Sequence, residues 1–246
     1  MQHDVFLVGT YHKTGTVWME RVFTEVAGKL GLSFTGTHLG MGQRAPEPGI
    51  YQDEHCHFPE SLLSADCVGF RMIRDPRDVA ISGAHYHMKT HETWLHQPLD
   101  AFGGKTYQEA ILAEPDMAAR YVFEAQQVAN ATTLSMVQDY ERLSEFITVR
   151  YEEWVTDETM SCFGATMAQM GLSADECALA RQAFFDWSLF GRGGNMDDHA
   201  RSGKVAQWRT VFSRRLGESF LEMHGDALVT LGYEKNHDWV LSLPVA

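Results

Sequence analysis

Short apolar runs alternate with longer segments of helical period along the chain. Residues 5–8 form a continuous apolar run, which predicts a buried parallel strand. Residues 17–30 then repeat apolar side chains at helical spacing, and Gly31 is expected to end that helix. The pattern therefore predicts a strand, a tight turn and a helix at the start of the chain.

The same alternation continues towards the C-terminus. Two further apolar runs predict buried strands at residues 67–73 and 146–151. Helical periods predict helices that open at 78–82 and cover most of 107–144, 157–187 and 213–231. Residues 36–60 are rich in Gly, Pro and His and predict a loop region. Strands that alternate with helices predict an α/β fold, a P-loop-like doubly wound parallel sheet flanked by helices.

Composition narrows the possible partners and locations. Hydrophobic residues make up 44% of the 246 residues, enough for a core. We expect a single domain over residues 1–246, although this length also fits two small domains. The formal net charge of −13 argues against nucleic acid as a partner. No stretch approaches the ~20 apolar residues of a membrane span, so no membrane partner is expected. The four cysteines form no CxxC pair and indicate reduced thiols in a cytoplasmic protein.

The turn after the first predicted strand has the features of a phosphate site. A loop between a strand and a helix N-terminus directs backbone N–H groups and the helix dipole at one point, and Lys13 and Thr16 add a charge and a hydroxyl. A Walker A loop has its lysine directly after the second glycine, whereas Lys13 precedes Gly15 by two positions. This spacing argues against an ordinary ATP or GTP enzyme. A turn that only connects strand to helix is the alternative.

Residues 10–18 resemble the 5′-phosphosulfate loop of cytosolic sulfotransferases that use 3′-phosphoadenosine 5′-phosphosulfate (PAPS). The family pattern is T-Y-P-K-S-G-T-x-W, and this chain departs from it at His12 and Thr14, where the second change keeps a hydroxyl. The resemblance implies that Lys13 contacts the bridging oxygen of the donor and that Trp18 stacks on adenine. The donor-binding residues of this loop would be Lys13, Thr14, Gly15, Thr16, Val17 and Trp18.

A second block, residues 74–82, resembles the family's 3′-phosphate block R-[ND]-P-[KR]-D-x-x-x-S. Arg74 at a strand end and Ser82 on the next helix can converge on one phosphate, to which an arginine donates a bidentate, charge-assisted contact. An exposed cluster of ion pairs is the alternative explanation of the same residues.

A third block, residues 199–209, resembles the family's R-K-G-x-x-G-D-W-[KR] stretch. The resemblance implies that Arg201, Ser202 and Gly203 cover the 3′-phosphate as part of a flexible lid at 191–204. Ser202 replaces the family's lysine, so one basic contact is lost. Tyr151 and Phe185 match family positions near adenine, although simple core packing explains both equally well.

The acceptor side of the family carries a histidine base in the segment K-T-H-L-P. Here the matching residues are 55–59, so His57 corresponds to that base and His55 to the lysine. Histidine accepts a proton near neutral pH because its unperturbed pKa is about 6.5. A further cluster, His85, His87, His91 and His96, does not provide an identifiable third ligand, and no metal is expected. Whether His55 or the 85–91 segment assists catalysis stays open.

Together the three blocks imply a sulfotransferase that moves a sulfuryl group from PAPS to a hydroxyl or amine of a small-molecule acceptor and releases PAP. The expected catalytic residues are Lys13, His57 and Ser82. The family's dimerisation pattern is only partly kept, so a monomer and a homodimer are both compatible. The competing hypotheses are a P-loop nucleotide kinase and a non-catalytic nucleotide-binding protein.

Overall fold

The computed structural model describes residues 2–36, 47–191 and 203–245. The chain divides into two compact units, each built from two stretches of sequence. The first unit comprises Met1–Arg74 and Glu141–Lys204, and the second comprises Asp75–Tyr140 and Val205–Ala246. The expectation of one domain over the whole chain stays a prediction.

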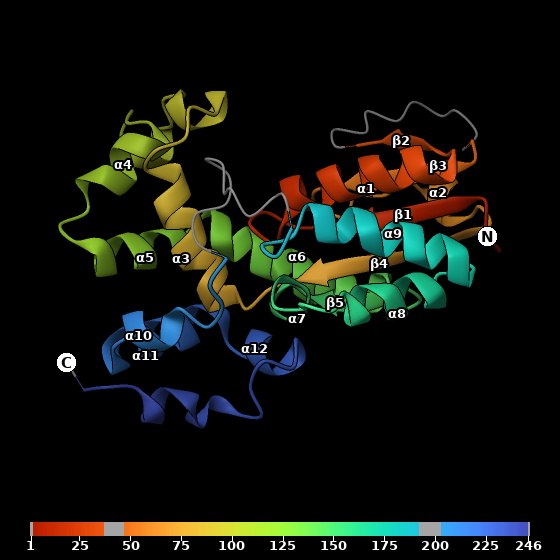
Figure 1. The fold of residues 1–246 in the computed structure, drawn as a ribbon. Coiled ribbons are helices and arrows are strands. Elements are labelled where there is room, and N and C mark those ends of the chain that lie inside the picture. Colours follow the sequence, from red (N-terminus) through yellow and green to blue (C-terminus); the bar gives the residue numbers. More distant parts are fainter. Residues whose placement is uncertain (1, 37–46, 192–202, 246) are drawn as a thin grey trace. The chain divides into compact units, whose positions relative to one another are not determined.

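The first unit contains a parallel sheet of five strands in the order β2-β3-β1-β4-β5. The strands are β1 (Val5–Gly9), β2 (Ser33–Thr35), β3 (Gly49–Asp53), β4 (Cys67–Ile73) and β5 (Ile147–Arg150). From the central β1 the chain adds strands first on one side and then on the other (Figure 1). This arrangement confirms the predicted α/β fold with a parallel, doubly wound sheet.

Helices of the first unit flank the sheet, and all of those named below except the one over residues 60–63 contribute side chains to one hydrophobic core. They are α1 (Thr16–Leu30), α2 (Glu60–Leu63), α7 (Tyr151–Val155), α8 (Ser161–Gln169) and α9 (Ala174–Asp186). Phe6 and Val8 of β1 pack in this core with Phe23 of α1 and Phe163 of α8, all of them buried. Helix α1 packs along α9, as Figure 1 shows. The alternating side chains of β1 thus fix the face on which these helices lie.

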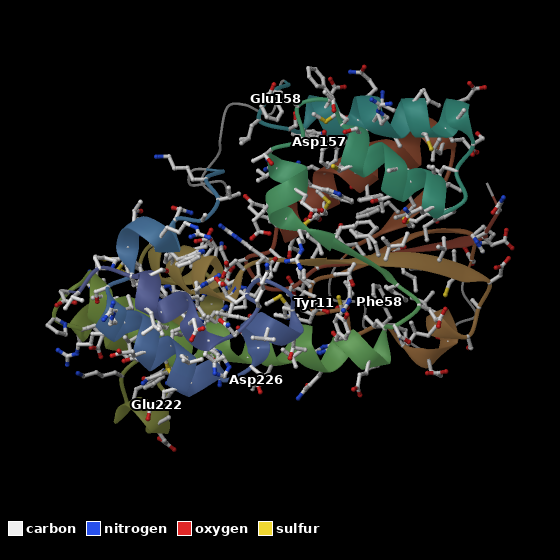
Figure 2. The ribbon with its side chains drawn as sticks, turned by 90° about the horizontal axis from the view of Figure 1, so that it is seen from below. Tyr11, Phe58, Asp157, Glu158, Glu222 and Asp226 are labelled. Carbon is white, nitrogen blue, oxygen red and sulfur yellow. The ribbon has the colours of Figure 1, made fainter. Side chains whose placement is uncertain are left out.

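Local sequence signals define the ends of these helices. Gly31 ends α1 in the left-handed conformation with φ 69°, and its N–H donates to the carbonyl of Ala27. Ser173 and Glu176 form a capping box at the start of α9. Before α8, the carboxylate of Asp157, labelled in Figure 2, accepts the N–H of Cys162 at 2.7 Å. Polar side chains thus satisfy terminal N–H groups at the starts of α8 and α9, and a backbone hydrogen bond closes the end of α1.

The second unit is helical in its described part. Its helices are α3 (Pro76–His87), η1 (Thr93–His96), η2 (Asp100–Phe102), α4 (Tyr107–Ala113), α5 (Met117–Gln126), most of α6 (Val128–Arg142), α10 (Trp208–Val211), α11 (Arg214–His224), α12 (Ala227–Thr230) and η4 (His237–Ser242). Arg77 lies at the centre of this unit, with its guanidinium carbon 3.5 Å from the ring centroid of Trp208 and 4.6 Å from that of Trp239. It also pairs with Asp75 and Glu234, each at 2.7 Å. One buried arginine therefore joins the start of α3 to the C-terminal segment.

Three local predictions need correction. Residues 49–53 were expected in a loop, yet they form β3, because pairing with β1 on one side and β2 on the other outweighs their mixed local composition. Tyr151 was placed at the end of a strand and is the first residue of α7. The single helix expected over 213–231 is interrupted at Gly225, whose φ of 51° favours glycine and ends α11. In the part of the chain that the structure describes, no helix is long and apolar enough to cross a membrane.

Candidate active site

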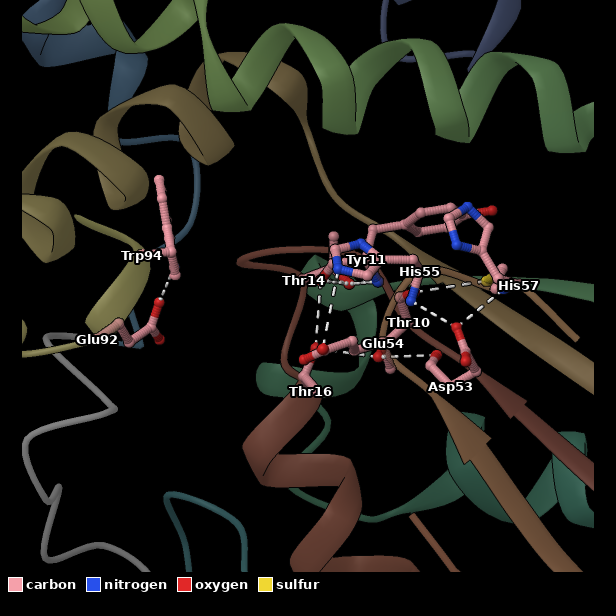
Figure 3. Close-up of polar contacts among 11 residues, drawn as sticks. Thr10, Tyr11, Thr14, Thr16, Asp53, Glu54, His55, His57, Glu92 and Trp94 are labelled. Carbon is pink, nitrogen blue, oxygen red and sulfur yellow. Dashed lines mark hydrogen bonds and ion pairs between the residues drawn. The ribbon is translucent and has the colours of Figure 1, made fainter. Parts of the chain in front are cut away.

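The phosphate loop, residues 9–16, runs from the last residue of β1 to the first residue of α1. Hydrogen bonds among its own polar groups stabilise it. The hydroxyl of Thr14 accepts the N–H of Tyr11 at 2.8 Å and donates to the carbonyl of Tyr11 at 2.9 Å. The N–H of Thr14 also donates to that carbonyl at 3.0 Å. The hydroxyl oxygens of Thr10 and Thr16 lie 3.0 Å apart across the loop (Figure 3). Thr14 thus stabilises the turn, and its contact with a donor phosphate stays a prediction.

Two residues of this loop have left-handed backbone, Lys13 with φ 61° and Gly15 with φ 112°. They turn the chain into α1, where no side chain caps the N-terminus and no acidic residue lies in the first turn. The amide of Gln52 in β3 donates to the carbonyl of Thr16 at 2.9 Å and holds this helix start against the sheet. An uncapped helix N-terminus next to a lysine is suited to an anion, because the helix dipole and the first N–H groups are directed at it.

Arg74, one residue beyond β4, joins this loop to the sheet. Its Nη1 donates to the carbonyl of Lys13 at 2.9 Å, and its guanidinium carbon lies 4.4 Å from the centroid of the Tyr151 ring. The side chain is buried, and its Nε has no hydrogen-bond partner among the described residues. The structure thus brings together three residues singled out from sequence: Lys13, Arg74 and Tyr151.

Aromatic side chains pack together beside the phosphate loop. Trp18 meets Tyr151 edge-on, with ring centroids 6.1 Å apart, and Phe184 at 5.0 Å. Phe184 is fully buried, whereas 37% of the neighbouring Phe185 is exposed. The ring that packs on Trp18 is therefore Phe184, a residue that the sequence analysis did not select. The contact of Phe185 and Trp18 with adenine stays a prediction.

The histidine loop, residues 53–57, leaves the sheet at the end of β3. The Oδ1 atom of Asp53 accepts the N–H groups of both His55 and His57, each at 2.8 Å (Figure 3). The two imidazole rings are exposed and lie 5.6 Å apart. Between them, Cys56 is buried and has left-handed backbone with φ 55°. This geometry presents two imidazoles to solvent from one constrained loop.

The other expected donor-binding residues belong to the second unit, to the last part of the first unit, or to residues outside the described ones. Ser82 lies on α3 in the second unit, and its convergence with Arg74 on one phosphate stays a prediction. Arg201 and Ser202, with most of the expected lid, lie outside the described residues. Gly203 has φ 59°, and a Cβ atom there would lie 2.5 Å from the side chain of Leu189, so both the backbone and the available space favour glycine.

Two histidines of the second unit, His85 and His87, contact polar side chains of that unit. His87 is fully buried, and its Nδ1 contacts the carboxylate of Glu124 at 2.8 Å. The same carboxylate accepts the hydroxyl of Tyr107 at 2.8 Å; burial, together with the charge of Glu124, raises the pKa of Tyr107 far above its usual range. His85 contacts the hydroxyl of Tyr121 at 3.0 Å. Among the described residues, no group of three or more His, Cys, Asp and Glu side chains is arranged to hold a metal ion.

Sequence reasoning missed Asp53, Gln52 and Arg142, which fix the two loops in place. Asp53 and Gln52 are the last residues of β3, so recognising that strand would have placed them at the carboxyl edge of the sheet. Arg142 donates to the carbonyl of Cys56 from a position 86 residues further along the chain. No local pattern signals a contact of that kind.

Comparison with known proteins gives matches at the level of structure. No protein-family model and no curated protein sequence matches this chain. The crystal structure of mouse sulfotransferase SULT7A1 complexed with PAP matches with a TM-score of 0.57 and 19% sequence identity, over 98% of this chain and 89% of that one. A retinol dehydratase in complex with androsterone and the inactive cofactor PAP matches with a TM-score of 0.53 and 13% identity, over 93% and 81% of the two chains. The chain therefore has the fold of these PAP-bound proteins, a sulfotransferase-type fold.

Proposed function

We propose that this chain is a PAPS-dependent sulfotransferase that transfers a sulfuryl group to a hydroxyl or amine of a small-molecule acceptor. The fold supports this proposal, because two proteins with a similar fold are named in complex with PAP. The sequence of the phosphate loop supports it independently, because Lys13 and the residues around it follow the 5′-phosphosulfate pattern. That the acceptor is a small molecule, and that no metal takes part, are further parts of this proposal.

One observation carries the proposal: the guanidinium of Arg74, the backbone of Lys13 and the N-terminus of α1 meet at the phosphate loop. Arg74 contacts the backbone of Lys13, and α1 begins three residues after Lys13 without a side-chain cap. The buried Nε of Arg74, which has no partner among the described residues, is a donor still to be satisfied. These groups fit an anionic nucleotide despite the net charge of −13, because local charge dominates at close range.

The proposed role of each residue in sulfuryl transfer follows from its charge and its position in the site. Bound PAPS supplies a sulfuryl group attached to phosphate through an activated anhydride bond. The ammonium of Lys13 stabilises negative charge on the leaving phosphate oxygen. The imidazole of His57 is exposed and accepts the proton of the acceptor hydroxyl, which is a weak nucleophile while it keeps that proton. We assign Ser82 to the same catalytic set.

The remaining predicted contacts complete the donor site. We assign Trp18, Tyr151 and Phe185 to the adenine and Arg74, Arg201, Ser202 and Gly203 to the 3′-phosphate. Thr14, Gly15, Thr16 and Val17 are assigned to the 5′-phosphosulfate. Tyr151 also has a structural part, because its ring supports the guanidinium of Arg74.

The proposal is tested by incubating the protein with sulfur-labelled PAPS and a panel of phenols, alcohols, sterols and amines. We expect a sulfated product, detected by mass spectrometry, from at least one acceptor class, and no product from Lys13→Ala. Binding of PAP without transfer to any acceptor would instead favour the non-catalytic nucleotide-binding protein. Transfer of phosphate from ATP would favour the kinase.

A further inference from the structure

Asp53 binds both loops of the candidate site through different atoms. Its backbone carbonyl accepts the N–H of Thr10 at 3.0 Å and lies 3.5 Å from the Thr10 hydroxyl, so it holds the start of the phosphate loop. Its side-chain Oδ1 accepts the N–H groups of His55 and His57. The side chain is 7% exposed, so water competes little for these bonds. One residue thus fixes the histidine loop relative to the phosphate loop.

Cys56 provides a second connection between the same loops. Its thiol donates to the carbonyl of Thr10 at 3.5 Å, and a Cβ atom on Gly9 would lie only 2.5 Å from its sulfur. On the other side, Arg142 donates to the Cys56 carbonyl. The left-handed backbone of Cys56 is unfavourable for a residue with a side chain, so the surrounding contacts must stabilise it. Asp53 does so by binding the residues before and after it.

We infer that Asp53 is the positioning residue of His57, holding its backbone so that the imidazole stays beside the phosphate loop. This inference rests on the proposed function, because it gives Asp53 a role in transfer through His57. The carboxylate accepts backbone N–H groups of the loop, and no imidazole contact is needed for that role. Asp53 therefore affects the reaction through the position of the loop backbone that carries His57.

This distinction between geometry and charge gives a matched pair of variants. Asparagine at position 53 keeps an Oδ1 acceptor of the same shape and loses the charge, whereas alanine loses both. We expect Asp53→Asn to keep the histidine loop in place and Asp53→Ala to release it. Asp66→Asn is the control, because that carboxylate also belongs to the first unit but is 66% exposed and outside the site.

Amide hydrogen exchange tests the placement without any assay of activity. In the wild type, Asp66→Asn and Asp53→Asn, we expect the amides of His55 and His57 to be protected. In Asp53→Ala both amides should exchange at least tenfold faster, while the central strand β1 keeps its protection, which shows that the fold is retained. Unchanged protection of both amides in Asp53→Ala would overturn the inference.

Steady-state sulfuryl transfer tests the consequence for catalysis. We expect Asp53→Ala to lower kcat about 10²-fold, as a displaced catalytic group does, while the PAP dissociation constant stays within about twofold. Asp53→Asn should keep most of the activity. In a double variant with His57→Ala, Asp53→Ala should add little further loss, because it acts through the same imidazole.

The outcomes separate this inference from the proposed function. A wild type that transfers no sulfuryl group from PAPS would overturn both. An active wild type with a fully active Asp53→Ala, or with losses that multiply in the double variant, would overturn the role of Asp53 alone. Asp53→Asn as inactive as Asp53→Ala would show that charge, and not positioning, is what matters, and would also overturn it.

Discussion

Lys13 combines a left-handed backbone with the only lysine charge in the phosphate loop. We expect Lys13→Ala to lower turnover about 10²–10³-fold, the effect of removing one electrostatic stabiliser of a developing charge. The PAP dissociation constant should change much less, because PAP lacks the sulfuryl group that departs. Kinetics and calorimetry on the same preparation check both numbers. Lys29→Ala, at the far end of α1, is the control and should behave as wild type.

Arg74 contacts the carbonyl of Lys13 and the ring of Tyr151. We expect Arg74→Ala to raise the PAP dissociation constant about 10–100-fold, since a hydrogen bond to a charged group contributes about 1.5–3 kcal/mol. Adenosine 5′-phosphosulfate lacks the 3′-phosphate and should lose less affinity. Calorimetry with both nucleotides measures the difference, with the exposed Arg181→Ala as the control. Equal losses for both would contradict the assignment to the 3′-phosphate.

At the scale of elements, α3 and α5 approach closely where Gly83 faces the buried carboxylate of Glu124. A Cβ atom on Gly83 would lie 2.4 Å from Glu124 Oε1, and hydrogen bonds to His87 and Tyr107 hold this carboxylate in place. We expect Gly83→Ala to lower the free energy of unfolding by about 1–3 kcal/mol, as overpacking does. Urea unfolding followed by circular dichroism measures this loss.

The control for that substitution is Gly28→Ala in α1. A Cβ atom on Gly28 would meet no described atom within 4 Å beyond its own helix backbone and chain neighbours, so alanine should raise the free energy of unfolding by about 0.5–1 kcal/mol through its better helix propensity. Equal free energies of unfolding for Gly83→Ala and Gly28→Ala would show that the close packing of α3 and α5 at Gly83 does not limit stability.

The elements that sequence predicted well are those with a strong local pattern. The helix after the phosphate loop and the strand over residues 67–73 match α1 and β4. β3 was missed because Gln52 and Asp53 are polar yet buried at the end of a central strand, where hydrogen bonds to the phosphate and histidine loops compensate their burial. Local composition carries no information on such partners.

The residues of the candidate site also differ in whether a local sequence pattern predicts them. Lys13 and Arg74 were found because their motifs are continuous in sequence, and the structure places them in contact. Asp53 and Arg142 were not found, because each acts through the backbone of residues that the fold alone brings near. Residues of a continuous motif are thus visible in sequence, whereas the residues that hold a loop in position require the tertiary structure.

The stability of the protein should depend on pH through His224, because both nitrogens of its ring are buried. His224 ends α11 in the second unit, and its ring lies 4.2 Å from that of Phe220. Burial lowers the pKa of His224 to about 4, well below the value of about 6.5 of an unfolded chain. The unfolded state therefore binds a proton at a higher pH than the folded state does.

The sign of the pH dependence follows from that difference. Above about pH 6.5 the imidazole of His224 is neutral in the folded and in the unfolded state, so its protonation does not lower the free energy of unfolding. As the pH falls from about 6.5 to about 4, the unfolded state gains a proton first, and the free energy of unfolding should fall by up to about 3 kcal/mol. We expect His224→Phe to remove this part of the slope, whereas His237→Gln, which changes a half-exposed ring, keeps it. Urea unfolding at pH 5 and pH 7.5 measures both slopes; a wild-type slope in His224→Phe would exclude His224 as its source.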